Sequence, residues 1–250
     1  MATKSFYAVI AGVGAGTGRS VALKFAKTYP VALLARKPES YQDIVKEIND
    51  AGGKAVGITT DVTEQASLEN AFTEIQKTDG FAGAGLAAAI YNVSGGFGGR
   101  KPFLETSLED LDASLASNPR GLYLFAKSAL PLLLKSVPDS PNPPTLLVTG
   151  ATASTRGSAF FSGFAAGKFA KRGLAQSLAR EFHPQGVHVA HAIIDAVIDI
   201  PRTKGYNVNG GAPDGKLSPD AIADEYWHLH TQHRSGFTQE IDLRPYVEKF

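Results

Sequence analysis

The chain contains no cysteine, which excludes a disulfide framework and any thiolate metal site. It also lacks an excess of charge of either sign. Its 25 lysine and arginine residues face 24 aspartate and glutamate residues and leave a formal net charge of +1. A balance of this kind does not suggest the basic patch of a nucleic-acid-binding protein. No apolar run approaches the roughly 20 residues of a membrane-spanning helix. We therefore expect neither a membrane nor a nucleic acid as a partner.

What remains is an ordinary globular composition, with 43% hydrophobic and 20% charged residues in a chain of 250. This length is near the upper limit for one hydrophobic core, so we expect a single domain over 1–250. No acidic residue precedes Glu39, as in a transit peptide, but residues 6–11 already have the pattern of a core strand. We expect a cytoplasmic protein.

Short apolar runs alternate with segments of helical spacing along the chain. The runs that predict strands cover 6–12, 31–36, 55–62, 85–95, 145–151, 187–195 and 237–243. Helical spacing is found at 18–30, 41–51, 66–77, the later part of 108–135, 163–182 and 219–229. Continuous apolar strands that alternate with helices are typical of a parallel sheet covered on both faces. The expected fold is α/β, a doubly wound parallel sheet of the Rossmann type.

Two segments interrupt this alternation. Residues 136–145 contain four prolines and predict a surface loop. Residues 202–217 contain four glycines and predict a mobile loop beyond the sixth strand. Because ligands bind outside the carboxyl ends of the strands in such sheets, we expect the second loop to cover a substrate.

The turn between the first strand and the first helix is rich in glycine. Gly12, Gly16 and Gly18 lie there, with Thr17 between the last two. Glycine permits a tight turn and a close approach of the backbone, and the free N–H groups at a helix N-terminus attract phosphate. The pattern alone is weak evidence, but its place between a strand and a helix favours a nucleotide phosphate site over a simple turn.

The spacing Gly-x-x-x-Gly-x-Gly resembles that of the short-chain dehydrogenase/reductase family, and the resemblance covers nearly the whole chain. Members of this family transfer hydride between a nicotinamide cofactor and a carbonyl or alcohol. The resemblance implies a small-molecule substrate and a homodimer or homotetramer. The long apolar segments 122–134 and 164–178 also favour an oligomer, because apolar helix surfaces need a partner surface. It implies cofactor-binding roles for Gly12, Gly16, Thr17, Gly18, Arg36, Asp61, Val62, Asn92, Lys168 and Ile198.

The end of the second strand bears on the choice of cofactor. Enzymes that use NAD usually place an acidic residue there to bind the ribose hydroxyls, and Ala35 stands in that place. Arg36 follows it and is suited to pair with the 2′-phosphate of NADP. We therefore expect NADP, as NADPH, rather than NAD.

The catalytic positions depart from the family pattern. The resemblance places the active-site lysine at Lys168 and the supporting asparagine at Asn118, next to Pro119, which should kink its helix. Phe164 stands four residues before Lys168, where the family has a tyrosine. Ala151 stands where the family has a serine. Neither side chain has an exchangeable proton, so neither can act as a general acid.

Three interpretations of this departure stay open. The alignment is displaced by one step, or hydride transfer continues with another proton donor, or the redox step is lost. If the redox step is lost, the fold would serve a non-redox isomerase or cyclase, or a nucleotide-binding sensor or interaction protein. The retained cofactor positions favour an NADP-dependent oxidoreductase of unknown substrate. The candidate donors are Ser154, Ser162 and Asp195, besides Lys168, Thr152, Tyr206 and a bound water.

Six histidines raise the question of a metal site. His228 and His230 are two residues apart and do not share a helix face, and no HExxH motif is present. We expect no metal, and we interpret the segment 226–237 as packing near a subunit contact.

Overall fold

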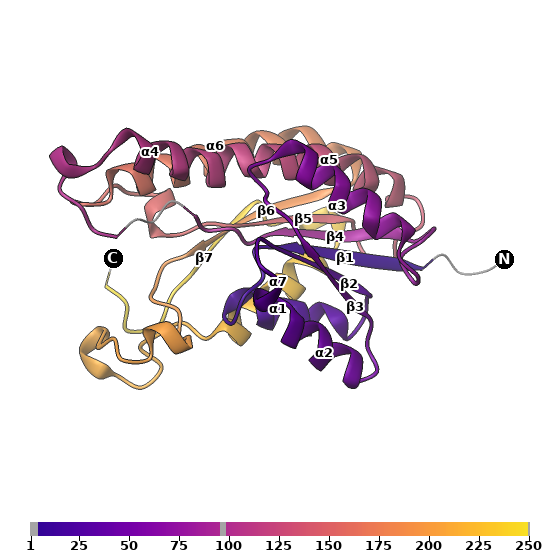
Figure 1. Cartoon of the computed structure of the whole chain (residues 1–250), viewed down its shortest axis with the longest axis horizontal. Coiled ribbons are helices and arrows are strands. Elements are labelled where there is room, and N and C mark those ends of the chain that lie inside the picture. The colour runs from indigo at the N-terminus through magenta and orange to yellow at the C-terminus, as the bar shows by residue number, and fades with distance from the viewer. Residues whose placement is uncertain (1–4, 96–98, 250) are drawn as a thin grey trace.

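A seven-stranded sheet forms the centre of the computed structural model, which describes residues 5–95 and 99–249 (Figure 1). The strand order is β3-β2-β1-β4-β5-β6-β7, and every neighbouring pair is parallel. The strands are β1 (Phe6–Ala11), β2 (Val31–Ala35), β3 (Ala55–Thr59), β4 (Gly85–Tyr91), β5 (Thr145–Thr149), β6 (His188–Ile194) and β7 (Glu240–Leu243).

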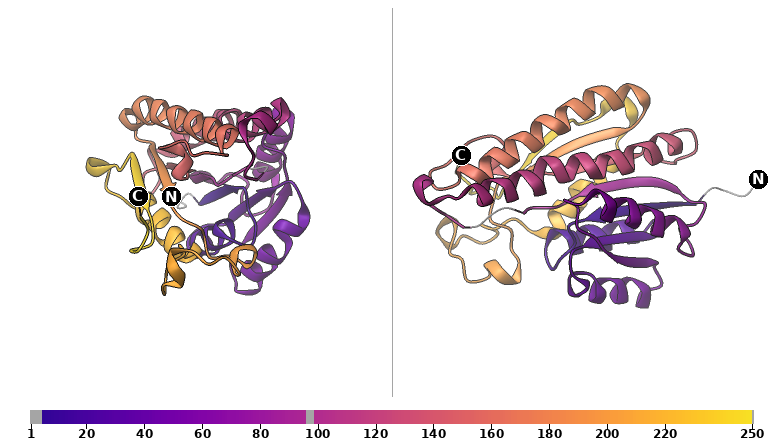
Figure 2. Two further views of the ribbon diagram at one scale, coloured as in Figure 1. Left: turned by 90° about the vertical axis from the view of Figure 1, so that its left-hand side faces the viewer. Right: turned by 45° about the horizontal axis from the view of Figure 1, so that its top comes forward.

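Helices cover both faces of this sheet (Figures 1 and 2). One layer consists of α3 (Gln65–Lys77), α4 (Leu108–Leu115), α5 (Gly121–Ser136) and α6 (Ser162–Phe182). The other consists of α1 (Thr17–Ala26), α2 (Gln42–Asp50) and α7 (Pro219–His230). The expected doubly wound α/β fold is confirmed. The strand order reverses between β1 and β4, and in such sheets a ligand binds at that point.

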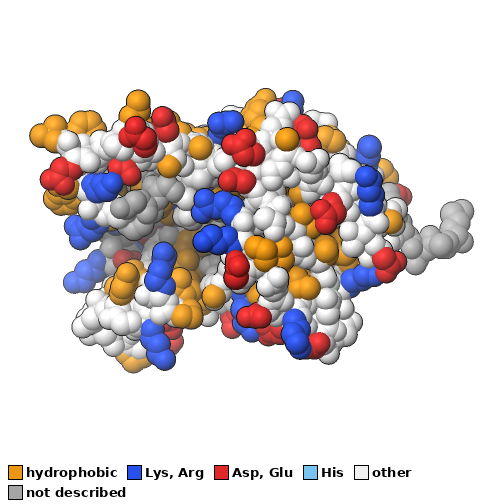
Figure 3. Space-filling view, viewed as in Figure 1, with side chains coloured by type: hydrophobic (Ala, Val, Ile, Leu, Met, Phe, Trp, Pro, Cys, Tyr) orange, Lys and Arg blue, Asp and Glu red, His pale blue; other side chains and the backbone are white. Residues whose placement is uncertain are grey.

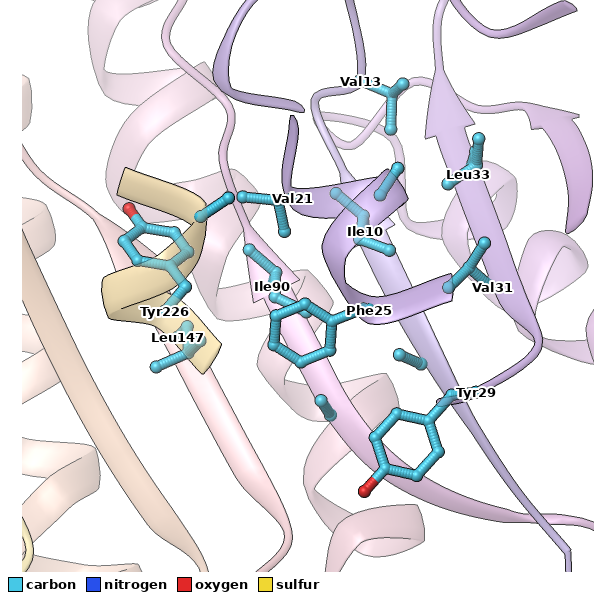
Figure 4. Packing of buried hydrophobic residues seen from close by; sticks show 14 of the residues in the cluster. Ile10, Val13, Val21, Phe25, Tyr29, Val31, Leu33, Ile90, Leu147 and Tyr226 are labelled. Carbon is cyan, nitrogen blue, oxygen red and sulfur yellow. The ribbon is translucent and has the colours of Figure 1, made fainter. Parts of the chain in front are cut away.

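Apolar side chains on both sides of the strands hold the layers together. Figure 4 shows Val21 and Phe25 of α1 and Tyr226 of α7 pointing toward Ile90 and Leu147 of the sheet. All five side chains are almost fully buried. A second cluster of buried apolar side chains fills the space under α3, α5 and α6. Burial on both faces explains why the strands read as continuous apolar runs.

Several element ends differ from the expectation. The third strand stops at Thr59, before the expected residue 62. The reason is that Asp61 Oδ1 accepts hydrogen bonds from Thr63 N at 2.9 Å and Thr63 Oγ1 at 2.7 Å, which turns the chain. The helical segment 108–135 is divided by a π-helical turn at Ala116–Arg120. Pro119 lies inside this turn and lacks a backbone N–H, so the hydrogen-bond pattern changes there.

The segment 202–217 lies beyond the sixth strand, at the end of the molecule that holds the carboxyl ends of the strands (Figure 1). It forms hydrogen bonds within itself, including one from Lys216 Nζ to Thr203 O at 2.8 Å. Another runs from Asn209 Nδ2 to Gly215 O at 2.8 Å. Mobility of this segment stays a prediction.

The histidine-rich segment near the C-terminus contributes to the core of the chain. His230 is fully buried, and its ring nitrogens lie 3.0 Å from Tyr29 Oη and 3.0 Å from Thr145 Oγ1. Trp227 packs against Phe25 and His230. This part of 226–237 therefore packs within the subunit. No described helix is both long and apolar enough to cross a membrane.

Candidate active site

A cavity of about 280 Å³ opens at the carboxyl ends of the central strands. Figure 3 shows a recess at this end of the molecule, with lysine and arginine side chains around it. The cavity brings together seven of the expected cofactor positions, while Arg36, Asp61 and Val62 lie outside its lining. The lining residues are Gly12, Gly14, Ala15, Gly16, Thr17, Gly18, Asn92, Ser94, Thr149, Gly150, Ala151, Lys168, Ile194, Ala196 and Ile198.

Glycine is required at two points of the loop between β1 and α1. Gly12 has a φ of +86°, and a Cβ added to it would lie 2.7 Å from the carbonyl carbon of Asn92. A Cβ on Gly18 would lie 2.7 Å from Gly12 O. Any side chain at either position would displace the backbone and widen the loop. At Gly12 and Gly18 the backbone of the loop therefore borders the cavity without a side chain.

The same loop carries polar groups that lack protein partners. Helix α1 begins after Gly16 without a side-chain hydrogen bond at its N-terminus. The Thr17 hydroxyl is buried and has no hydrogen-bond partner in the part of the chain that the structure describes. Buried polar groups are rarely left unpaired, and helix N-terminal N–H groups favour anions. The loop residues thus fit the phosphates of a nicotinamide dinucleotide.

Asn92 fastens the loop to the sheet. Its Nδ2 donates to Gly12 O at 2.9 Å, and its Oδ1 accepts from Thr149 Oγ1 at 3.0 Å. The Thr149 hydroxyl also lies 2.7 Å from Tyr226 Oη. This chain of hydrogen bonds links the ends of β1, β4 and β5, so Asn92 holds the floor of the cavity in place.

Arg36, Asp61 and Val62 lie at the ends of the neighbouring strands β2 and β3. Arg36 directly follows β2, its side chain is exposed, and it has no hydrogen bond or ion pair with the other described residues. Asp61 is partly exposed and uses Oδ1 in the turn with Thr63. Val62 is buried in the core under α3 and α5. A cofactor that extends from the cavity past β2 would meet Arg36 and Asp61.

Asn118 lies in the π-helical turn and is fully buried. Its Nδ2 donates to Ser114 O at 3.0 Å and to Gly95 O at 3.2 Å. Its Oδ1 is buried and has no hydrogen-bond partner among the described residues. A buried amide oxygen in this position calls for a donor such as a water molecule.

Lys168 lies on α6 and lines the cavity, although its side chain is only 1% exposed. Its Nζ lies 5.3 Å from the centre of the Phe164 ring. Burial lowers the pKa of Lys168 to about 8, and a hydrogen bond with Lys171 acts in the opposite direction. An ammonium with this pKa is a usable acid near neutral pH.

The three substitute donors named from the sequence do not line the cavity. Ser154 is buried, and its Oγ accepts a hydrogen bond from Ala151 N at 3.1 Å. Ser162 is the first residue of α6 and is exposed. Asp195 accepts a hydrogen bond from Thr152 and lies 3.5 Å from Arg244. Ala151 itself lines the cavity and contributes a methyl group there.

Sequence reasoning missed two groups next to the cavity. Lys171 is fully buried one turn after Lys168, and its Nζ donates to Val93 O at 3.1 Å. Its place on the apolar face of the predicted helix 163–182 was a signal that could have revealed it.

His191 is the second group. Its Nδ1 lies 2.9 Å from Glu240 Oε2, and Arg172 binds the same carboxylate at 2.6 Å and 2.7 Å. Burial lowers the pKa of His191 to about 4, so the ring is neutral at pH 7. The carboxylate can only accept, so Nδ1 carries the proton and Nε2, which is buried without a partner, has a free lone pair. Gly150 leaves space for the His191 ring, because a Cβ at position 150 would lie 2.3 Å from His191 Nε2.

In the part of the chain that the structure describes, no three His, Asp or Glu side chains come together as a metal site would require. The site therefore consists of a phosphate-type loop, a bridging asparagine and two buried lysines.

Comparison with known proteins identifies the family that shares this arrangement. The family model described as short chain dehydrogenase matches residues 7–204. A short-chain dehydrogenase/reductase of Armillaria gallica is 29% identical over 218 residues, which cover 85% of this chain and 78% of that protein. An L-2,3-butanediol dehydrogenase of Corynebacterium glutamicum is 27% identical over 195 residues, covering 76% of this chain and 71% of that protein.

Among solved structures, a short-chain dehydrogenase from Rhodopseudomonas palustris is 31% identical and superposes with a TM-score of 0.76. The match covers 97% of this chain and 99% of that one. Sequence and structure agree over nearly the full length, and the chain belongs to the short-chain dehydrogenase/reductase family.

Proposed function

We propose that this protein is an NADP-dependent oxidoreductase that reduces a carbonyl group of a small molecule. The observation that carries the proposal is the cavity itself. It places the phosphate loop, Asn92, Lys168 and Ile198 around one space of about 280 Å³. The bound cofactor supplies the hydride, and the protein supplies position and a proton. The loop would hold the phosphates, and Ile198 would pack beside the nicotinamide end.

The preference for NADP rests on the end of β2. Similar folds hold NADP in some solved structures and NADH in others, so the fold does not decide the cofactor. In this chain Ala35 offers no carboxylate to bind ribose hydroxyls, while the exposed Arg36 has no partner among the described residues. A free guanidinium at this place pairs with the 2′-phosphate that only NADP carries.

The reduction must proceed without a tyrosine or serine hydroxyl if Phe164 and Ala151 occupy the family's catalytic positions. The position of Phe164 on α6 supports this assignment, because it lies one turn before Lys168 with its ring centre 5.3 Å from Lys168 Nζ. Ser154 and Asp195 already have partners within the protein. Among the named candidates, Lys168 alone reaches the cavity, which favours it as the proton donor.

The experiment combines binding and turnover. Calorimetry with NADPH should show a single site per chain, and NADPH consumption should follow addition of 2,3-butanedione and other small carbonyl compounds. Lys168→Met should bind NADPH but lose turnover. NADPH binding without consumption across a broad panel of carbonyl compounds would refute the redox function and favour a non-redox or sensor role. Failure to bind any nicotinamide cofactor would refute the cofactor assignment as well.

A further inference from the structure

Two lysines lie on the buried face of α6, one turn apart. Lys168 is 1% exposed and Lys171 is 0% exposed. A buried ammonium is costly unless an anion compensates it. Among the described residues, neither amine forms an ion pair with a carboxylate. The pair therefore needs a physical explanation beyond packing.

The described groups around the two amines include no carboxylate that acts on either of them, although the Asp61 charge acts on the neighbouring Tyr91. Lys171 Nζ lies 5.6 Å from the centre of the Tyr91 ring on β4, and the Tyr91 hydroxyl donates to Ser117 O. Burial is the main cause that raises the pKa of Tyr91, so this phenol is neutral. On the side of β6 the charged or titratable neighbours are the neutral His191 and, on α6, Arg172, whose charge Glu240 of β7 already balances.

The donors and lone pairs of the two amines limit how many protons the pair can hold. An ammonium has three donors and no lone pair, so two ammonium groups cannot hydrogen-bond to each other. A hydrogen bond between Lys168 and Lys171 therefore forms only if one amine is neutral, and the burial of both amines one turn apart, without a carboxylate partner among the described residues, favours that state. Lys171 fits that role, because a neutral amine can donate to Val93 O at 3.1 Å and still accept from Lys168. Burial and the neighbouring Lys168 charge both lower the pKa of Lys171 well below its ordinary value.

We propose that Lys168 and Lys171 hold one proton between them and that Lys171 is a neutral positioning residue, which accepts a hydrogen bond from the Lys168 ammonium. The Lys168 ammonium in turn donates its proton to the oxygen of the carbonyl substrate. The donor role rests on the proposed function, whereas the shared proton does not.

The step balances without a further reactant. The hydride would come from the reduced nicotinamide, whose C–H bond breaks as that ring is oxidised. It would form a bond to the carbonyl carbon while the π electrons of the C=O bond move to the oxygen. This oxygen takes the proton from Lys168 Nζ and becomes the hydroxyl of the product alcohol. Lys168 is left as a neutral amine and regains a proton from water before the next turnover.

The test is an NMR titration of the full chain with ¹³C-labelled lysine εCH₂ groups. In the wild type, one buried lysine signal should titrate near pH 8, and Lys168→Met should remove it. Lys171→Gln keeps a neutral group that can donate to Val93 O and accept from Lys168, so the midpoint should stay within about half a pH unit. Lys171→Met removes the acceptor, so the ammonium is less stabilised and the midpoint should fall by one pH unit or more.

The same variants are compared in NADPH consumption with 2,3-butanedione as a function of pH. The loss of rate at high pH should move to lower pH in Lys171→Met and stay in place in Lys171→Gln. Equal midpoints in all three proteins would overturn the positioning role. If the wild-type NMR spectra show both buried lysines charged at pH 6, the shared proton is overturned. This result needs only the wild type, so it holds even if Lys171→Met does not fold. An intact titration without carbonyl reduction would instead overturn the proposed function and the donor role.

Discussion

Replacing Arg36 with alanine should abolish the preference for NADPH over NADH. A hydrogen bond to a charged group contributes about 1.5–3 kcal/mol, which corresponds to roughly 10- to 150-fold in affinity. Arg36 is exposed, so solvent screens the interaction and the lower end of this range applies. We expect wild-type protein to bind NADPH about tenfold more tightly than NADH. In Arg36→Ala the two affinities should become nearly equal, with NADH affinity little changed.

Calorimetry with both cofactors at low and high ionic strength measures this ratio directly. Lys37→Ala is the matched control, because Lys37 is also basic and exposed but lies one residue farther from β2. The preference should weaken as salt is added, since the contact is ionic. Equal NADPH and NADH affinities in the wild type, or an equal loss of both in Arg36→Ala, would refute the role of Arg36.

Four further predictions concern the catalytic positions, the packing beneath the cavity, the pH dependence of stability and the assembly. The double change Phe164→Tyr with Ala151→Ser should raise the rate of reduction of simple ketones by more than the two single changes combined, because general acid catalysis contributes about 10²–10⁴-fold. A gain in rate no larger than additive would count against the alignment. Gly150→Ala should destabilise the fold by about 1–3 kcal/mol in chemical denaturation, since its Cβ would lie 2.3 Å from His191 Nε2, whereas Gly157→Ala has no atom within 4 Å and should be neutral. The pKa of His191 is about 4 when folded and near 6.5 when unfolded, so the contribution of this group to the free energy of unfolding should be constant above pH 7. It should fall between about pH 6.5 and 4, by up to about 1.4 kcal/mol per pH unit, in chemical denaturation at a series of pH values. Light scattering at micromolar concentration should give a dimer or tetramer, and a monomer would contradict the oligomer prediction.

The fold could be predicted because its signals are local. Continuous apolar strands, helical spacing and glycines at the first turn repeat along the chain, and each is a consequence of burial on both faces of a parallel sheet. The ends of elements were less predictable. Strand β3 stops at Thr59 because the Asp61 carboxylate turns the chain, and the helical segment after Leu108 changes pitch because Pro119 has no N–H to donate.

The site could be predicted only where one residue type has one function. Glycines in a strand–turn–helix unit predict a phosphate loop, and the cavity contains Gly12, Gly16 and Gly18. The partners of the substitute donors could not be predicted, because those contacts join distant segments. Asp195 meets Thr152 and Arg244, and no pattern in the sequence relates these three positions.

If Phe164 stands at the family's tyrosine position, its ring and the chemistry of the buried lysines belong together in this site. An ordinary lysine ammonium has a pKa of about 10.4 and is a weak acid at neutral pH. With Phe164 beside it, Lys168 has an apolar ring in place of a polar neighbour, and burial lowers its pKa to about 8. Lower pKa means a better proton donor, up to the point where the amine is no longer protonated. In the proposed pair Lys171 acts against this loss, because its lone pair accepts a hydrogen bond from the Lys168 ammonium and so opposes the lowering of the Lys168 pKa by burial. Under that assignment, an apolar residue at 164 and a second lysine at 171 would act together, and Lys168 would donate the proton that a tyrosine hydroxyl donates elsewhere in the family.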